Sequence, residues 1–310
     1  VDRPGRRFSV FAAWMIAYLA SYVMIALSIR SLAAYFTVIE IATLRSLGSL
    51  MIAGAVVWAD GAAYAGFARV GLRDDIARSL LHMAGSLALI WSVANLPLSL
   101  VSTIEFSGPL FAAALVFIAT RRSPETIPTI GLGLLATGIA MLLAKHNIGQ
   151  SPGVLVAIGA VAILTTTNLL LTRLAAHRPT IAIILLMHMI QLPVYLLLGA
   201  VVPADWAGTL RQGDPDPPIG ELVLLVCAAL ALIIGGFVTQ MALANASRHG
   251  TPLQLCAADA MRVPLITLAA YLLLNELPRG EIVMPGLWVL CGVIVASLPT
   301  RRSVAAKPAT

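Results

Sequence analysis

Long apolar runs recur along almost the whole sequence. Each is about twenty residues long, which is the length that a helix needs to cross the hydrocarbon core of a bilayer. Charges, glycine or proline interrupt them, as in RVGLRDD, KHNIGQSPG and GDPDPP. The sequence therefore predicts an all-α integral membrane protein with ten transmembrane helices, near residues 8–29, 35–59, 77–95, 97–119, 125–145, 153–172, 180–202, 220–244, 252–274 and 281–299.

The composition favours a membrane protein over other classes. Of the 310 residues, 59% are hydrophobic and only 11% are charged, whereas a soluble domain carries about a quarter charged residues. The net charge of +6 comes from short arginine clusters between apolar runs, so it indicates membrane topology, and no nucleic-acid partner is expected. The three cysteines form no CxxC motif, and neither a metal site nor a cofactor is expected.

Arginine and lysine orient the ten expected helices. With the N-terminus in the cytoplasm, 14 of these residues fall in inner segments and 4 in outer ones, while Arg45 and Arg262 lie within spans. Basic residues accumulate on the cytoplasmic side of membrane proteins. We therefore expect cytoplasmic tails at residues 1–7 and 300–310 in a bacterial inner membrane, with His82 at a cytoplasmic helix end and without a special role.

The two halves of the chain share helix-breaking residues at one constant spacing. At an offset of 155, Pro97 matches Pro252, Pro109 matches Pro264 and Gly131 matches Gly286. Halves of five spans each, residues 8–146 and 153–299, would enter the membrane from opposite sides. The pattern thus predicts two inverted five-helix repeats, an arrangement that secondary transporters use to bind a substrate near the midplane.

Kinks are expected in the fourth and ninth spans. Proline removes a backbone donor and clashes with the preceding turn, so Pro109 and Pro264 should bend their helices, with Gly108 allowing close backbone approach. The freed carbonyl groups must find a partner or line a cavity. Both a cavity-lining kink and a kink that serves packing alone remain open.

Three stretches resemble a known transporter family. VIEIATLRSLGSLMI, LPLSLVSTIEFSGPLF and ADAMRVPLITLAAYLLLNELP are similar to segments of the EamA-like permeases in the drug/metabolite transporter superfamily. The second of these resembles the fourth span of threonine/homoserine-type amino-acid exporters. The resemblance implies ten helices in two inverted repeats and a transport activity. It leaves the substrate open, because the family includes exporters of amino acids and drugs and importers of vitamins and cofactors.

Several ionisable side chains fall inside the apolar runs. A charge at such depth is costly in lipid, so each should face the bundle interior. Glu105 could take up a proton or a substrate ammonium, or form a static pair with Arg262 or Arg45. Asp259 and Arg262 are three residues apart and share a helix face. Arg262 could hold a substrate carboxylate or lock its helix through an internal ion pair.

Other polar residues have less specific interpretations. Glu40 and Arg45 are interpreted as a gating or structural ion pair. His188 could relay protons, and Asn168 could line the substrate site, although polar residues often bond between helices. These residues complete the predicted site.

The function expected from these features is a permease that moves a small amphoteric metabolite by alternating access. Amino-acid export coupled to protons is the leading interpretation, and import or exchange of a vitamin, nucleoside-like cofactor or organic cation is the alternative. A membrane-embedded enzyme or a receptor is disfavoured, because neither a catalytic set nor a cytoplasmic module is evident. The expected partners are a small-molecule substrate and the lipid bilayer; a homodimer is left open.

Overall fold

The chain folds into a bundle of helices. The computed structural model describes residues 4–59, 72–121, 126–145, 152–202, 218–250, 255, 258–259, 261–274 and 280–297. These residues are almost entirely helical and include no strand, which confirms the all-α expectation. The helices are α1 Pro4–Leu32, α2 Val38–Ala59, α3 Leu72–Asn95, α4 Leu98–Glu105, α5 Gly108–Thr120, α6 Thr126–Lys145, α7 Pro152–Ala175, α8 Thr180–Val201, α9 Ile219–His249, α11 Arg262–Leu274 and α12 Gly280–Ser297.

Six helices are long and apolar enough to cross a membrane. They are α1, α2, α3, α7, α8 and α9, and they have between 22 and 31 residues in their apolar segments. Each corresponds to one of the apolar runs of the sequence. Such a set is typical of a multi-pass membrane protein.

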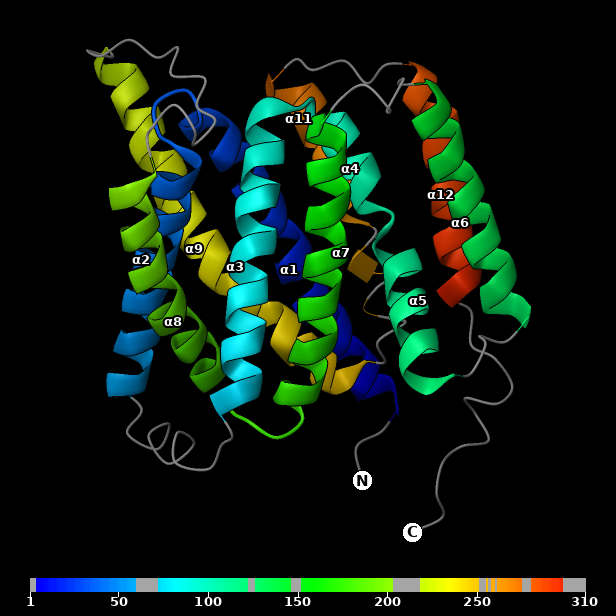
Figure 1. Ribbon diagram of the computed structural model, residues 1–310, viewed down its shortest axis with the longest axis horizontal. Coiled ribbons are helices and arrows are strands. Elements are labelled where there is room, and N and C mark those ends of the chain that lie inside the picture. The colour runs from blue at the N-terminus through cyan, green and yellow to red at the C-terminus, as the bar shows by residue number, and fades with distance from the viewer. Residues whose placement is uncertain are drawn as a thin grey trace.

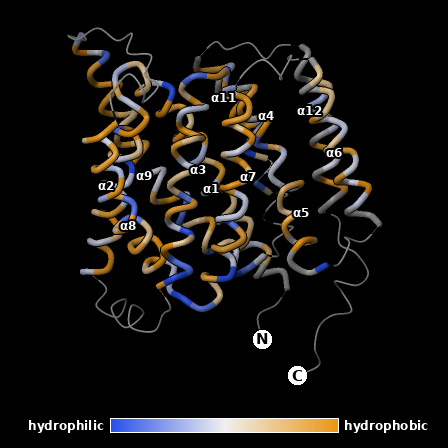
Figure 2. Tube along the Cα trace, in the orientation of Figure 1, coloured by the Kyte–Doolittle hydropathy of each residue, from blue (hydrophilic) through white to orange (hydrophobic). Residues whose placement is uncertain are grey.

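Most of the residues along the helices are hydrophobic (Figure 2), and many of them are exposed on the surface of the bundle. Met51 is 67% exposed, Leu197 63% and Leu273 67%, and many other large apolar side chains face outward as well. Polar and charged side chains, in contrast, are buried between the helices, among them Arg78, His82, Glu105 and Gln191. This distribution suits a lipid environment, in which ionisable groups are stable only when they face the interior of the bundle.

The helices pack in pairs that join distant parts of the chain (Figure 1). α1 packs along α9, α3 along α7, α2 against α8 and α6 against α12. The α6–α12 pair lies at one edge of the bundle and touches the rest only slightly, through α5 and α4. A Cβ added to Gly292 would lie 2.5 Å from the backbone nitrogen of Leu135. The two backbones can therefore approach only because residue 292 has no side chain.

Helix ends on one side of the bundle are held by side chains. Thr37 and Glu40 form a capping box at the start of α2: the Thr37 N–H donates to Glu40 Oε2 over 2.6 Å, and the Glu40 N–H donates to Thr37 Oγ1 over 3.1 Å. Arg30 Nη1 donates to the carbonyls of Val93 and Ala94, at 3.2 and 3.1 Å. It thereby satisfies carbonyl groups that the end of α3 leaves unpaired.

The fourth apolar run, residues 97–119, forms two helices instead of one bent helix. α4 ends at Glu105 and α5 begins at Gly108, with Phe106 and Ser107 in a turn between them. Ser107 Oγ donates to the Ile104 carbonyl over 2.6 Å, which satisfies one of the carbonyls at the end of α4. Pro109 is the second residue of α5, where a missing N–H has no cost. The predicted kink is therefore a complete interruption.

The ninth run is also divided. Its described helix, α11, begins at Arg262, so that Pro264 is the third residue of a helix and lies in the first turn. Met261 precedes it in a turn, and its N–H donates to the Ala258 carbonyl over 3.1 Å. Both prolines thus begin a helix segment instead of bending a continuous one.

Candidate functional site

Five buried or partly buried residues form a cluster where the broken helices meet α1. We call it the tyrosine–carboxylate cluster: Tyr18, Tyr22, Glu105, Asp259 and Arg262. Arg262 lies 3.5 Å from Glu105, between Nη2 and Oε1, and 3.2 Å from Asp259, between Nη1 and Oδ1. Tyr22 donates to Glu105 over 2.5 Å, and Tyr18 donates to Asp259 over 2.6 Å. Each carboxylate is therefore held by one tyrosine and by the shared guanidinium.

The helix interruptions position this cluster. Glu105 is the last residue of α4 and Arg262 is the first residue of α11, so both charges lie at helix ends inside the bundle. Tyr18 and Tyr22 are four residues apart, which places both rings on one face of α1. Their centroids are 5.9 Å apart. The guanidinium carbon of Arg262 lies 4.6 Å from the centroid of the Tyr22 ring, as in a cation–π contact.

The cluster contains more negative than positive charge. Two carboxylates share one guanidinium, and both Glu105 and Arg262 are buried, at 5% and 8% exposure. Buried charges are stable in proteins when they are paired and hydrogen-bonded. When both acids are ionised, the described residues of the cluster leave one negative charge without a cationic partner. A proton or a substrate cation could neutralise it.

A central cavity lies beside the cluster. Tyr18, Tyr22 and Arg262 line it from one side, and Arg45, His82, Ser86, Asn168, Thr239 and Gln240 are its other polar lining residues. Its volume in this conformation is about 70 Å³. Since one water needs about 10–15 Å³ on this scale, the cavity has room for several waters. A metabolite would require the helices to move apart.

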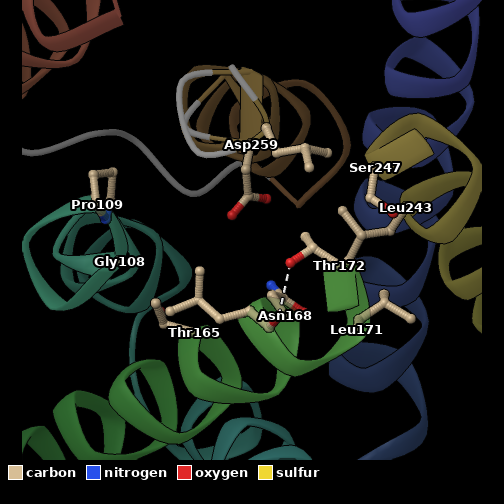
Figure 3. Close-up of a pocket in the computed structure, with 11 residues that line it drawn as sticks. Gly108, Pro109, Thr165, Asn168, Leu171, Thr172, Leu243, Ser247 and Asp259 are labelled. Carbon is tan, nitrogen blue, oxygen red and sulfur yellow. Dashed lines mark hydrogen bonds between the residues drawn. The ribbon is translucent and has the colours of Figure 1, made fainter. Parts of the chain in front are cut away.

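A second cavity lies between α5, α7 and α9, and we call it the α5–α7 cavity (Figure 3). Its lining includes Gly108, Pro109, Thr165, Asn168 and Asp259. In Figure 3 Asp259 points into the space, with Gly108 and Pro109 on one side and Asn168 on α7 facing it. Asp259 belongs to the tyrosine–carboxylate cluster and Asn168 lines both cavities. The broken helix and the cluster therefore lie between two internal spaces.

A second group of buried polar residues lies on α2, α3, α8 and α9. We call it the arginine–histidine cluster: Arg45, Arg78, His82, His188, Gln191 and Gln240. Arg78 Nη2 donates to Gln240 Oε1 over 3.0 Å, and the Gln240 amide nitrogen lies 2.9 Å from His82 Nε2. His188 Nδ1 lies 3.1 Å from Ser46 Oγ. Neither arginine forms an ion pair with any described residue; Asp75, one turn before Arg78, pairs with Arg178 instead.

The hydrogen bonds of this cluster determine how His82 is protonated. A guanidinium can only donate, so Gln240 Oε1 must be its acceptor and the Gln240 amide nitrogen must donate to His82 Nε2. His82 Nδ1 lies 3.3 Å from Ser86 Oγ and 3.1 Å from the Gln191 amide nitrogen, which donates to the Ser79 carbonyl, so an imidazolium would face amide donors at both ring nitrogens. This arrangement requires a neutral imidazole. Both positive charges of the cluster are therefore those of Arg45 and Arg78.

The structure brings some of the residues predicted for the site together and separates others. Glu105, Asp259 and Arg262 share the tyrosine–carboxylate cluster. Asn168 lines both cavities, and His188 is buried in the arginine–histidine cluster. Gly108 and Pro109 line the α5–α7 cavity. Pro264 lies one turn from the cluster's arginine, near the start of α11.

The interpretation of Glu40 and Arg45 as an ion pair is wrong. Glu40 accepts from the backbone of Thr37 in the capping box, and Arg45 forms no ion pair with any residue that the structure describes. The reason is geometric. Five residues correspond to a rotation of about 140° around a helix, so the carboxylate stays at the helix start while the guanidinium points into the bundle.

The expectation that His82 lies at a helix end is also wrong, because His82 lies within α3, is 4% exposed and lines the central cavity. Arg78, counted among the cytoplasmic arginines, is likewise buried, at 2% exposure. A signal was present in the sequence: Arg78, His82 and Ser86 follow one another at intervals of four, which places them on one helix face.

Comparisons with known proteins give information about the fold only. No protein-family model and no curated protein matches the sequence. A solved structure described only as "Crystal structure of protein" is similar, with a TM-score of 0.68 over 95% of this chain and 99% of that chain, at 15% sequence identity. At this identity the similarity concerns the fold alone. It shows that nearly the whole chain adopts an arrangement also found in another protein.

Proposed function

We propose that this chain is a secondary transporter of the bacterial plasma membrane, of the drug/metabolite transporter type, that moves a small amphoteric metabolite by alternating access. The leading form of the proposal is export of an amino acid or related metabolite, driven by proton exchange. Ten membrane crossings would form two inverted five-helix repeats, with both chain termini in the cytoplasm. The bias of basic residues supports this orientation.

The observation that carries the proposal is the meeting of two interrupted helices at buried charges beside a cavity. α4 ends at Glu105, α11 begins at Arg262, and the central cavity lies against both tyrosines of the cluster. Discontinuous helices with ionisable groups at the break, deep in the bundle, are the usual way in which secondary transporters build a substrate site. An ion pair that served only stability would not need a cavity on either side.

Helix packing supports the inverted repeats. If α1 corresponds to α7, α2 to α8, α3 to α9 and α6 to α12, then the α1–α9 contact has its counterpart in the α7–α3 contact. The pairs α2–α8, α6–α12 and α4–α11 each join an element to its own counterpart, with α11 corresponding to the α4–α5 region. Repeats that face each other in this way can rock around a site at their interface.

The charges of the tyrosine–carboxylate cluster bear on the coupling. Glu105 is bound by Tyr22 and Arg262, which line the central cavity in front of it, and a proton and a substrate ammonium could compete for its charge. If the two compete for Glu105, proton binding and substrate binding exclude one another, and entry of a proton accompanies release of the substrate. The surplus negative charge also suits an organic cation, which keeps import or exchange of a cation as the alternative. The direction of gradient-driven flux distinguishes the two.

The test is flux in proteoliposomes that contain the purified full chain. We expect a pH gradient to drive movement of labelled amino acids, and the Glu105→Gln variant to lose gradient-driven flux while it keeps its folding. Asp74→Asn, which changes an exposed carboxylate outside both clusters, should transport as the unchanged protein does. Full gradient-driven flux in Glu105→Gln would remove Glu105 from the mechanism, and chemical conversion of the solute would indicate an enzyme.

A further inference from the structure

Arg45 is a partly buried cation that no described residue neutralises. It belongs to α2, and its Nε and Nη2 atoms are buried without a hydrogen-bond partner. The Tyr195 hydroxyl lies near the guanidinium but does not reach hydrogen-bond geometry. Among the described residues no carboxylate pairs with Arg45. A guanidinium has five N–H donors, and here none of them binds a described protein acceptor.

The described residues around Arg45 add a second positive charge and supply no carboxylate to balance the first. Arg78 lies in the same cluster, and its hydrogen bonds go to the neutral acceptors Gln240 Oε1 and Met187 Sδ. His82 is a neutral hydrogen-bond acceptor at Nε2, as derived above. The carboxylate of Asp75 is bound to Arg178. The described part of this region therefore holds two cations and no free anion.

Gly236 on α9 leaves room for the Arg45 side chain. A Cβ added to Gly236 on α9 would lie 2.7 Å from Arg45 Cγ and 3.1 Å from Arg45 Cδ. The stem of the arginine thus passes directly over a glycine, and from there its guanidinium reaches the wall of the central cavity. The missing side chain at Gly236 therefore leaves the space through which Arg45 extends to the cavity.

The central cavity consequently has two poles of opposite sign. At one pole Tyr18, Tyr22 and Arg262 line the wall, and the two carboxylates that they bind lie behind them, so that negative charge is in excess in this cluster. At the other pole Arg45 lies with Arg78 behind it, and positive charge is in excess. Both Arg45 and Arg262 line the same cavity. A molecule that carries an ammonium and a carboxylate would neutralise both poles when it lies along the cavity.

We propose that Arg45 holds the carboxylate of a zwitterionic substrate whose cationic group lies against Tyr18 and Tyr22, at the end of the cavity where the carboxylates of Glu105 and Asp259 leave negative charge in excess. This proposal rests on the proposed transport function and names the substrate class and the anion-binding residue. Arg262, the residue that sequence reasoning considered for this role, is occupied by two carboxylates of the protein. An arginine binds a carboxylate in a forked, charge-assisted geometry, and in a water-poor cavity the unpaired cation at Arg45 favours the arrival of an anion.

The test compares three forms of each probe on the detergent-purified full chain. The probes are the twenty standard amino acids, their methyl esters, which lack the carboxylate charge, and their N-acetyl derivatives, which lack the ammonium. For the unchanged protein we expect at least one amino acid to bind about 10- to 100-fold more tightly than its ester, as expected for a hydrogen bond to a charged group. Titration calorimetry provides the dissociation constants.

Substitutions test whether Arg45 is responsible for the preference for an amino acid over its methyl ester. Arg45→Gln should bind the amino acid as weakly as its ester, with the affinity for the ester unchanged. Arg173→Gln removes the same charge from an exposed position on α7 and should keep the full preference. The proposal is overturned if Arg45→Gln retains the preference, if only Arg262→Gln loses it, or if no amino acid is preferred to its ester.

A second measurement distinguishes a ligand-binding arginine from a structural one. Because no described residue pairs with Arg45, Arg45→Gln and Arg45→Lys should melt, without ligand, at the same temperature as the unchanged protein or at a higher one. A lower melting temperature of both variants would show that Arg45 stabilises the fold and would overturn the proposal.

Flux in proteoliposomes separates this proposal from the proposed function. Transport of an organic cation without any requirement for a carboxylate would leave the transporter assignment intact and overturn the role of Arg45. Binding of an amino acid that depends on Arg45, without any flux, would do the opposite.

Discussion

The tyrosine–carboxylate cluster and the arginine–histidine cluster hold their arginines in opposite ways. Arg262 lies between two carboxylates and over a tyrosine ring, so its charge is balanced inside the protein. Arg78 is as deeply buried, and Arg45 is partly buried with its Nε and Nη2 atoms enclosed. The hydrogen bonds of Arg78 go to neutral acceptors, and Arg45 has none from the described residues. The difference indicates that the first cluster holds the interrupted helices together, whereas under our proposal a ligand in the cavity completes the second.

The largest effect on stability is expected from replacing Arg262, the arginine whose charge is balanced inside the protein. Arg262→Gln would leave Glu105 and Asp259 facing each other without their shared cation. Breaking a buried ion pair by removal of one partner costs about 3–5 kcal/mol, so the variant should unfold at a clearly lower temperature. Thermal unfolding in detergent measures the change, with Arg173→Gln as the surface control. An unchanged melting temperature would mean that the cluster does not stabilise the junction of α4 and α11.

A second test disturbs the other cluster through its packing. Gly236→Ala would place a methyl group 2.7 Å from Arg45 Cγ, and because this atom is in the middle of the stem the whole side chain must move. Overpacking of this kind costs about 1–3 kcal/mol, and the displaced guanidinium should bind a carboxylate less tightly. Gly54→Ala on α2 is the matched control, since an added Cβ there has nothing within 4 Å. Equal behaviour of the two variants would show that Arg45 is not fixed by α9.

The smallest expected effect comes from making the second cluster resemble the first. Gln240→Glu would place a carboxylate against Arg78, where the amide oxygen now accepts over 3.0 Å. The second carboxylate oxygen would face His82 Nε2, so His82 would carry its proton there and accept at Nδ1 from the Gln191 amide. A hydrogen bond between charged groups is stronger than a neutral one, so we expect a gain of about 1 kcal/mol in the free energy of unfolding. The added anion should also weaken binding of carboxylate ligands. A loss of stability would show that the charge of Arg78 is already balanced.

Sequence alone gave the helical class and most of the long helices, because a run of about twenty apolar residues has few other ways to satisfy its backbone in lipid. It also placed Glu105, Asp259 and Arg262 in one predicted site, since charges inside apolar runs must turn inward. The interruption at Phe106–Ser107 could not be read in the same way. Apolar length is the same for a bent helix and for two consecutive short ones, and the difference depends on the Ser107 contacts.

The second cluster was harder to predict for a different reason. Arg78 and His82 lie near the charged segment that precedes α3, and composition assigned them to the membrane surface. The spacing of Arg78, His82 and Ser86 indicates a common face, but not whether that face turns inward. Their partner Gln240 is 158 residues from His82 along the chain. Contacts at this sequence distance follow from how α3, α8 and α9 pack, which no local pattern specifies.

The α6–α12 pair has a consequence for how the molecule responds to its surroundings. Its two backbones are locked at Gly292, while its contacts with the remaining helices are sparse. A pair with so few contacts to the other helices can move as a unit, so bilayer thickness and lateral pressure would act on the bundle mainly at this edge. If the chain transports by alternating access, as we propose, reconstitution in lipids of increasing chain length would then change the rate of transport more than the affinity for the substrate.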